Sequence, residues 1–215
     1  MVNENLRDDR QFAPPTQRNR EPILTVLRRV LPESGTVLEV ASGTGEHAAF
    51  FAPRLKPRLW LPSDCNPLHL DSIAAWRDYV GVQTLLSPVH LDATADRWSI
   101  KRTPPPQLQD SPISAIVCIN MIHIAPWSAG LGLLAGAGRI LPAGGLLYLY
   151  GPFKEGGRHT APSNEAFDAM LRDRDPAWGV RDLETVIEVA DSEGLTWLET
   201  IDMPANNRSI LFRKT

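Results

Sequence analysis

The sequence predicts an α/β fold in which a doubly wound, mostly parallel β-sheet ends in an antiparallel C-terminal hairpin. Short apolar runs typical of buried strands alternate five times with segments whose apolar residues recur at helical spacing. The last two alternating segments, 196–203 and 209–214, flank turn residues and are typical of a hairpin. A chain of 215 residues is long enough for one sizeable core, so we predict a single domain over residues 1–215.

The first predicted elements are a helix, a strand and a second helix. Five apolar side chains recur on one face of residues 20–31, and Pro32 ends that helix. The run 37–41 is apolar apart from Glu39 and therefore predicts a buried strand. A helix over residues 46–55 follows it.

The next two strands are shorter. Residues 59–61 are apolar, and Asn66 and Pro67 then supply an N-cap and a first-turn proline for a helix that continues through Trp76. A third strand is expected to end at Asp92. The remaining predicted elements are strands at 114–119 and 146–150 and helices at 131–140, 165–172 and 183–193.

Composition and charge argue against several functional classes. A net charge of −3 lacks the basic surplus of a dedicated nucleic-acid binder. No apolar run approaches the roughly 20 residues that cross a membrane, and the charged N-terminus does not resemble a secretory signal. The two cysteines, Cys65 and Cys118, stand in unrelated contexts, which favours a reducing compartment. We expect a cytoplasmic protein that binds neither nucleic acid nor membrane, and its oligomeric state stays open.

Polar residues cluster where the predicted strands end. Doubly wound sheets bind ligands at the carboxyl ends of their strands. Glu39, Asp64 and Asp92 stand at or near the ends of the first three strands, and residues 120–123 follow the fourth. The glycine loop 42–45 follows the first strand. The sequence therefore predicts one ligand site along this edge.

The glycine loop is compatible with more than one ligand. A phosphate-binding loop of the Walker type is excluded, because no Lys-Ser or Lys-Thr pair follows. Gly43, Gly45 and Ala48 satisfy the dinucleotide pattern G-x-G-x-x-A, but Glu46 stands at the helix start and would repel a pyrophosphate. Glu39 favours a cationic ligand such as S-adenosylmethionine.

Two acidic residues further along the edge suit the adenosyl part of such a ligand. Asp64 offers two acceptor oxygens to ribose hydroxyls, and it would do so for S-adenosylmethionine or for a dinucleotide. Asp92 suits an adenine amino group, and the backbone N–H of Ala93 suits a ring nitrogen.

At this point several motifs resemble a known family. "VLEVASGTGEH", "PSD", "LDA" and "LPAGGLLYLYGPF" resemble motif I, post-I, motif II and the fifth-strand region of class I S-adenosylmethionine-dependent methyltransferases. "QRNREPIL", "NMIHIAPW", "FDAMLRDRDPAWGVRD" and "NNRSILFRK" are more closely similar to the methyltransferase-like 26 family, over residues 14–214. The resemblance implies a Rossmann-like, seven-stranded sheet with the closing hairpin. It implies little about the methyl acceptor.

The resemblance and the positions of the polar residues together give the predicted cofactor site. Residues 1–19 are expected to be flexible or to cover the cofactor, and Arg20 to close over its carboxylate. The predicted cofactor-binding residues are Arg20, Glu39, Ala41, Gly43, Thr44, Gly45, His47, Asp64, Cys65, Asn66, Asp92, Ala93, Asn120 and Met121.

Methyl transfer is an in-line displacement that needs positioning, and a base when the acceptor is a hydroxyl or thiol. His123 and Asn120 stand where the methyl group is expected to point; His123 is either that base or a residue that shapes the pocket, and His159 is its rival. The five histidines share no metal-ligand spacing, so no metal is expected. The predicted acceptor pocket comprises Trp127, Tyr150, Phe153, Trp178, Asn206 and Asn207.

The main hypothesis is a methyltransferase that uses S-adenosylmethionine and acts on a small, partly apolar molecule. An NAD(P)-dependent oxidoreductase is the alternative that the G-x-G-x-x-A match leaves open. A third hypothesis is a protein of methyltransferase fold that binds the cofactor but acts through a protein partner.

Overall fold

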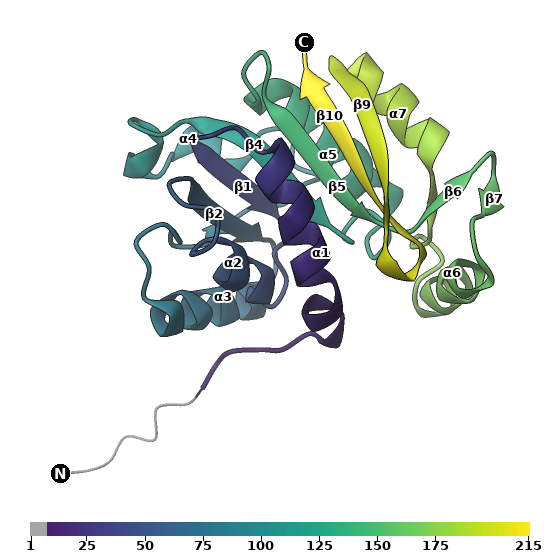
Figure 1. Ribbon diagram of the computed structural model, residues 1–215, viewed down its shortest axis with the longest axis horizontal. Coiled ribbons are helices and arrows are strands. Elements are labelled where there is room, and N and C mark those ends of the chain that lie inside the picture. Colours follow the sequence, from purple (N-terminus) through teal and green to yellow (C-terminus); the bar gives the residue numbers. More distant parts are fainter. Residues whose placement is uncertain (1–7) are drawn as a thin grey trace.

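The computed structural model describes residues 8–215. Its centre is a seven-stranded sheet with the strand order β3-β2-β1-β4-β5-β10-β9 (Figure 1). The pairings from β3 to β5 are parallel, and β10 is antiparallel to both β5 and β9. The predicted doubly wound sheet with a closing hairpin is therefore confirmed. The strands are β1 (Thr36–Val40), β2 (Leu59–Asp64), β3 (Val89–His90), β4 (Ile113–Ile119), β5 (Leu146–Gly151), β9 (Leu195–Met203) and β10 (Asn207–Lys214).

Helices cover both faces of the sheet, because successive strand side chains point to opposite faces. Val37 packs with the helices on one face, and Leu38 with those on the other. The first face is covered by α1 (Pro14–Val30), α2 (Glu46–Phe51) and α3 (Pro67–Val80). The second is covered by α4 (Ser99–Arg102), α5 (Trp127–Ile140) and α7 (Leu183–Ser192), whereas α6 (Pro162–Arg174) lies beside β6 and β7 (Figure 1).

The start of α1 differs from the prediction. The helix begins at Pro14, six residues before the predicted start, so Arg20 lies within the helix and does not precede it. Apolar periodicity begins only at Ile23, because the first turns bury the polar side chains of Thr16 and Asn19. A pattern of apolar residues therefore misses these turns.

The third strand also differs from the prediction. β3 ends at His90, and Asp92 lies in the turn that follows, where its side chain is exposed. Oδ1 of Asp92 accepts hydrogen bonds from the backbone N–H of Thr94 at 2.8 Å and from its hydroxyl at 2.7 Å. This local turn competes with strand pairing and ends the strand early.

A second, three-stranded sheet was not predicted. It has the order β7-β6-β8 and consists of β6 (Phe153–Glu155), β7 (Arg158–His159) and β8 (Arg181–Asp182). Strands of two or three residues are too short to show the alternation that identifies a strand in a sequence. This small sheet joins the end of β5 to α7 (Figure 1).

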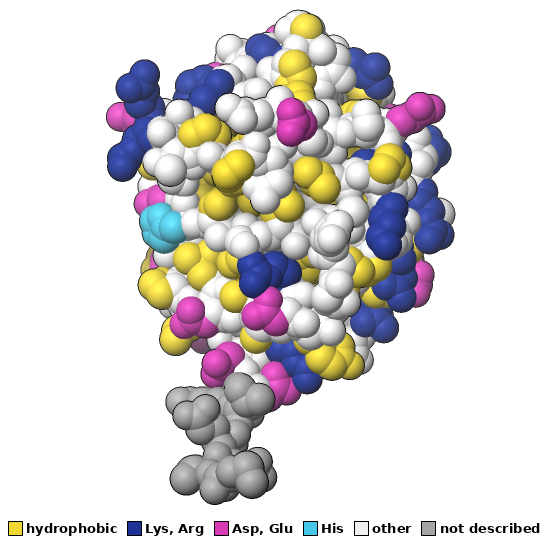
Figure 2. Space-filling model, turned by 90° about the vertical axis from the view of Figure 1, so that its left-hand side faces the viewer, with side chains coloured by type: hydrophobic (Ala, Val, Ile, Leu, Met, Phe, Trp, Pro, Cys, Tyr) yellow, Lys and Arg dark blue, Asp and Glu magenta, His cyan; other side chains and the backbone are white. Residues whose placement is uncertain are grey.

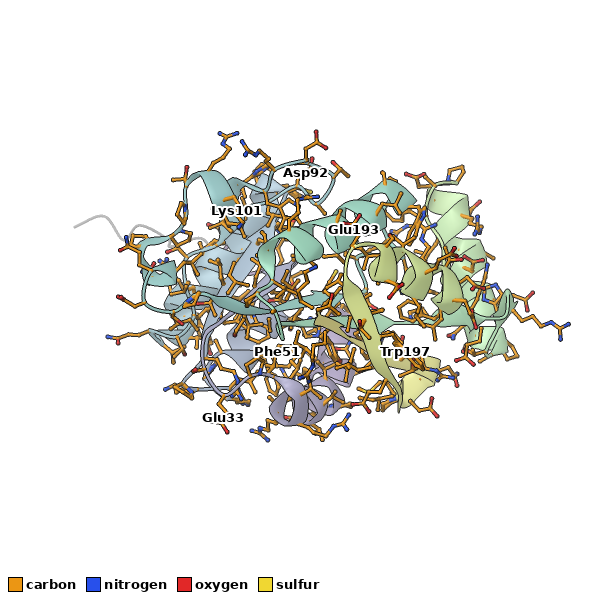
Figure 3. The ribbon with its side chains drawn as sticks, turned by 90° about the horizontal axis from the view of Figure 1, so that it is seen from above. Glu33, Phe51, Asp92, Lys101, Glu193 and Trp197 are labelled. Atoms are coloured by element: carbon orange, nitrogen blue, oxygen red, sulfur yellow. The ribbon has the colours of Figure 1, made fainter. Side chains whose placement is uncertain are left out.

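The described chain has an apolar interior and a mixed surface. Phe51 lies inside the molecule and is fully buried, whereas Asp92 and Lys101 lie at the periphery (Figure 3). On the face shown in Figure 2, Lys and Arg side chains are interspersed with Asp and Glu, and hydrophobic side chains are scattered among them. Among residues 8–215, no helix is both long and apolar enough to span a bilayer.

Candidate functional site

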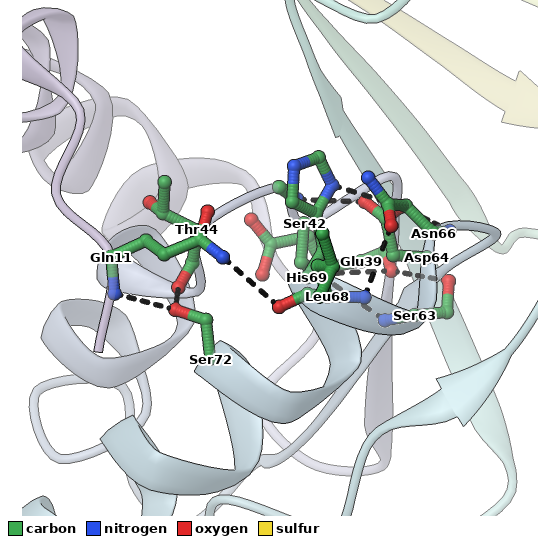
Figure 4. A network of polar contacts seen from close by, with 11 residues as sticks. Gln11, Glu39, Ser42, Thr44, Ser63, Asp64, Asn66, Leu68, His69 and Ser72 are labelled. Atoms are coloured by element: carbon green, nitrogen blue, oxygen red, sulfur yellow. Dashed lines mark hydrogen bonds and ion pairs between the residues drawn. The ribbon is translucent and has the colours of Figure 1, made fainter. Parts of the chain in front are cut away.

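The glycine loop joins β1 to α2 and is fastened to β2. The backbone N–H of Ser42 donates to the carbonyl of Ser63 at 2.8 Å, and the Ser63 hydroxyl donates to the carbonyl of Glu39 at 2.7 Å (Figure 4). Ala41, Gly43 and Gly45 all have positive φ angles, of 57°, 57° and 86°. The loop is thus a sharp turn whose shape is set by its bonds to the neighbouring strand.

The two glycines of the loop serve different purposes. A methyl group added to Gly45 would lie 2.9 Å from both Cα and Cγ1 of Ile73 on α3. A methyl group added to Gly43 would meet no atom within 4 Å. Gly45 therefore allows α3 to pack against the loop, and Gly43 leaves the space above the loop open.

This difference leads to a stability prediction. Gly43→Ala is expected to cost about 1–2 kcal/mol, the ordinary cost of a left-handed conformation for a residue with a Cβ. Gly45→Ala is expected to cost roughly 1–3 kcal/mol more, because its methyl group also overpacks against Ile73. Urea unfolding of the two variants measures the difference. Equal losses of stability would contradict the separate role of Gly45.

Asp64, at the end of β2, is buried and organises the edge next to the loop. Its Oδ2 accepts the backbone N–H of Gly43 at 2.9 Å. Its Oδ1 accepts the backbone N–H of Asn66 at 2.9 Å and lies 3.1 Å from Nδ1 of His69 (Figure 4). Because a carboxylate oxygen has two acceptor positions, Oδ2 retains one for a ligand hydroxyl.

Glu39 lies near the carboxyl end of β1, opposite Pro62 of β2 and Val117 of β4. Its carboxylate is buried and accepts the indole N–H of Trp60 at 2.8 Å. Burial raises the pKa of Glu39 to about 7, although the hydrogen bonds from Trp60 and Ser42 pull it down. The residue is thus poised between its neutral and charged forms near neutral pH.

Glu46, in the first turn of α2, holds the N-terminal strap, which we define as residues 8–13. Its Oε2 accepts the backbone N–H of Ala13. The backbone N–H of Gln11 donates to the Ser72 hydroxyl at 2.8 Å, and this hydroxyl donates to the carbonyl of Thr44 in the glycine loop at 2.7 Å (Figure 4). The strap is thereby connected to the loop through α3.

His47 is a packing residue in this structure. Its Nε2 lies 2.8 Å from Oδ1 of Asn19, and its ring stacks on Phe51 with centroids 5.5 Å apart. Burial, with the charge of Arg20, lowers its pKa to about 3, so the ring is neutral. Arg20 lies over the ring of Phe50, 4.7 Å from its centroid. The cofactor contacts of His47 and Arg20 stay predictions.

The other adenosyl-side residues lie next to Asp64 or beyond it. Cys65 is exposed, and Asn66 caps α3 by accepting the backbone N–H of Leu68 at 3.0 Å. Ala93 is half-buried, and its carbonyl lies 3.4 Å from the indole nitrogen of Trp98. Contacts of these residues and of Asp92 with adenine stay predictions.

The loop after β4 places Asn120 and His123 beside the end of β5. Asn120 has a positive φ of 64°, and its backbone N–H donates to the carbonyl of Tyr150 at 2.8 Å. The buried Met121 separates it from the turn that carries His123. A methyl group added to Gly151 would lie only 2.5 Å from Nε2 of His123. Gly151 therefore makes room for this ring at the carboxyl edge.

His123 is fully buried, and neither of its ring nitrogens has a hydrogen-bond partner among the described residues. Its ring packs edge-on against Phe153, with centroids 4.9 Å apart. Burial, together with the charge of Arg181, lowers its pKa to about 3. The ring is therefore neutral and has a free acceptor nitrogen. Buried polar atoms without partners are rare, and in the absence of a ligand they indicate where one could bond.

His159, the rival residue, belongs to a buried charge cluster that the sequence reasoning missed. Oδ2 of Asp168 on α6 lies 3.3 Å from Nε2 of His159, 3.2 Å from Nζ of Lys154 and 3.2 Å from Nε of Arg172. Oδ1 accepts the backbone N–H of Val180 at 2.7 Å. Burial raises the pKa of Asp168, but the hydrogen bonds from Val180, Lys154 and Arg172 outweigh it and lower the pKa. Asp168 and Arg172 are one helical turn apart, but no sequence pattern joins them to Lys154 and His159.

The residues predicted for the acceptor pocket do not gather around one cavity. Tyr150 and Phe153 are buried in the cores on opposite faces of the sheet, and Trp178 lies in the turn after α6. Asn206 bonds the Ser163 hydroxyl at 3.1 Å, and Asn207 bonds the Pro204 carbonyl at 3.1 Å, so both side chains stabilise the hairpin turn and its contact with α6. Trp127 lines a groove beside the small sheet.

A protein-family model matches residues 10–214 and is described as a protein of unknown function, DUF938. This chain belongs to the DUF938 family. The match covers residues 10–13 of the strap, the glycine loop, α6 and the closing hairpin of this DUF938 protein. Its finer resemblance to the methyltransferase-like 26 family stays a prediction.

Three solved structures of similar fold are named as methyltransferases. An O-methyltransferase family protein from Burkholderia thailandensis has a TM-score of 0.74 and 13% identity, over 93% of this chain and 57% of that one. An O-methyltransferase family 2 protein from Planctomyces limnophilus, in complex with apigenin, has a TM-score of 0.70 and 20% identity, over 91% of this chain and 62% of that one. Human N-acetylserotonin methyltransferase, in complex with S-adenosylmethionine, has a TM-score of 0.70 and 14% identity, over 93% of this chain and 52% of that one. The DUF938 chain thus spans 52–62% of these relatives' length.

Proposed function

We propose that this DUF938 protein is an S-adenosylmethionine-dependent methyltransferase that acts on a small molecule. The observation that carries the proposal is the acidic edge formed by Glu39, Asp64 and the open space above Gly43, in a fold similar to that of its methyltransferase neighbours. A free position on Asp64 suits a ribose hydroxyl, and the buried acid Glu39 suits a nearby ammonium group. The cofactor would supply an electrophilic methyl group at this edge.

The same geometry disfavours the dinucleotide alternative. A pyrophosphate binds at the free N–H groups of a helix N-terminus. At the start of α2, the buried carboxylate of Glu46 accepts the N–H of Ala13, so a negative charge and the strap already lie there. Fitting a phosphate would require moving both.

Asn120 and His123 are our candidates for the residues next to the methyl acceptor. They lie beside the ends of β4 and β5, and both ring nitrogens of His123 lack partners in the described chain. A neutral ring has a lone pair that can take the proton of an acceptor hydroxyl or thiol. His159 is the second candidate base, since Asp168 orients its Nε2 and its buried Nδ1 has no partner in the described chain.

A small-molecule acceptor is supported by two of the structural neighbours. The Planctomyces protein was solved with apigenin, and the human enzyme is named for N-acetylserotonin. Both are small aromatic molecules. For the DUF938 protein, the acceptor class is a proposal that rests on these neighbours.

The pKa of Glu39 leads to a pH-dependence prediction. With a pKa of about 7, the free protein must lose a proton from Glu39 before its carboxylate can pair with the cofactor ammonium. Affinity for S-adenosylhomocysteine is therefore expected to fall as the pH drops through 7, and to be about tenfold weaker at pH 6 than at pH 8. Calorimetry measures the profile.

Glu39→Gln is the control for this prediction. The variant keeps an acceptor oxygen for Trp60 but cannot titrate, so its affinity should be lower and should change little between pH 6 and pH 8. An unchanged slope in the variant would show that another group causes the pH dependence.

The test of the proposed reaction is conversion of S-adenosylmethionine to S-adenosylhomocysteine in the presence of phenols, thiols and amines. We expect one acceptor class to accelerate the conversion. A protein that binds the cofactor but converts it with none of these acceptors would favour the third hypothesis, in which the fold acts through a protein partner.

A further inference from the structure

A groove lies on the side of the small sheet, between the start of α5, the strands β6 and β8, and α7. Its volume is about 410 Å³, within the range of roughly 300–1,000 Å³ typical of small-molecule sites. Trp127, Lys154, Val180, Arg181 and Thr185 contribute to its lining. None of the lining residues comes from the glycine loop or from β1 and β2, so the groove is separate from the proposed cofactor edge.

The charge in this groove is fixed in place. The guanidinium of Arg181 donates from Nε to the carbonyl of Ile122 at 3.0 Å, and from Nη2 to the carbonyls of Ala125 at 2.8 Å and Ala177 at 2.9 Å. These three bonds leave Nη1 without a bonded partner in the described chain. The guanidinium is therefore preorganised, and an incoming anion need not pay for ordering it.

The charge of Arg181 is also not neutralised. No carboxylate of residues 8–215 lies within ion-pair distance of it, whereas Lys154 and Arg172 both pair with Asp168. Asp182, the acid that lines the groove, accepts the backbone N–H of Gly157 at 2.7 Å. Arg181 therefore brings to the groove a positive charge that has no ion-pair partner in the described chain, which suits a monoanion.

The rest of the lining suits a flat, apolar body. Trp127 is half-buried at the start of α5, and the guanidinium of Arg181 lies 5.6 Å from its ring centroid. A ring in the groove can therefore stack on the indole while its anionic substituent reaches the guanidinium. Val180 adds an apolar side chain to the lining, and Thr185 comes from α7.

We propose that this groove is a binding site for a small aromatic carboxylate, held by the free Nη1 of Arg181 and the indole of Trp127. A carboxylate matches the planar guanidinium, and the room available accepts a molecule of one or two rings. The proposal does not depend on the methyltransferase assignment.

The experiment compares three probes with the same ring system: 2-naphthoate, 2-naphthalenemethanol and 2-naphthylmethylamine. Calorimetry on the intact protein is expected to show 2-naphthoate binding at least tenfold more tightly than the neutral alcohol, the scale of one charge-assisted hydrogen bond. The amine should bind most weakly. Binding of the alcohol or the amine as tightly as the acid would overturn the proposal.

Matched variants locate the bound acid. Thr185→Trp fills the groove from an exposed position on α7, and we expect it to weaken 2-naphthoate binding by at least about tenfold. Asp191→Trp places the same side chain six residues further along α7, on another side of the helix and outside the groove lining, and should leave binding unchanged. Circular dichroism checks that both variants fold. Unchanged binding in Thr185→Trp, or equal losses in both variants, would overturn the site. The binding of 2-naphthoate at the groove is tested independently of S-adenosylhomocysteine binding, so failure of the proposed function would not decide it.

Discussion

Asp64→Asn is expected to weaken the binding of S-adenosylhomocysteine by about 3 kcal/mol, roughly 100-fold. The carboxylate accepts the backbone N–H groups of Gly43 and Asn66 with different oxygens, and it has one further position free for a ribose hydroxyl. In asparagine, an amide N–H₂ group replaces one of the two carboxylate oxygens. This donor would then face the backbone N–H that the oxygen accepts in the unmodified protein. The ribose loses a charged acceptor, and the glycine loop loses a fastening to β2.

Asp71→Asn is the matched control for this variant. Asp71 lies exposed on α3, within two turns of the same edge, and the substitution makes the same change in charge. Calorimetry should show its affinity for S-adenosylhomocysteine close to that of the unmodified protein. If both variants bind equally well, Asp64 does not hold the ribose.

The second large effect concerns stability. Asp168→Ala is expected to lower the free energy of unfolding by about 3 kcal/mol, because it leaves the half-buried partners of a buried carboxylate without their counter-charge. Lys154, His159 and Arg172 come from β6, β7 and α6, and the N–H of Val180 leads into β8. This expected loss lies at the low end of the range for buried ion pairs, because the Arg172 side chain is 49% exposed and stays partly solvated.

Urea unfolding measures this loss, and Asp173→Ala provides the comparison. Asp173 is exposed on the same helix, and substitutions at such positions change stability by about 0.5 kcal/mol or less. We expect the free energies of unfolding of the two variants to differ by more than about 2 kcal/mol. A smaller difference would show that Asp168 does not hold the small sheet against α6.

The sequence predicts the large sheet well because its signals are strong. The runs around β1, β4 and β5 are apolar and short, and turn residues bound them, so their burial follows from composition alone. The polar start of α1 and the short strands of the small sheet give no such signal. Their positions depend on contacts such as that between Asn19 and His47, which join residues 28 apart.

The candidate site divides in the same way. The loop around Gly43 and the carboxylate of Asp64 lie together at the carboxyl edge, as strand order alone predicts. The partner of Glu46 was not predictable, because the N–H of Ala13 reaches it from the strap. His47 and Asn206 carry local packing and turn bonds in the structure, and no motif distinguishes such roles from ligand contact. The cluster around Asp168 was not predicted, because Lys154 and His159 come from the short strands β6 and β7, which give no sequence signal.

The proposed function requires that the acidic edge beside Gly43 binds a phosphate-free adenosyl cofactor. Calorimetric titration of the intact protein with S-adenosylhomocysteine, and separately with NAD⁺ and NADH, tests it most directly. We expect saturable binding of S-adenosylhomocysteine with one ligand per chain, and no measurable heat from either dinucleotide. Tight binding of NAD⁺ or NADH, with no response to S-adenosylhomocysteine, would contradict it.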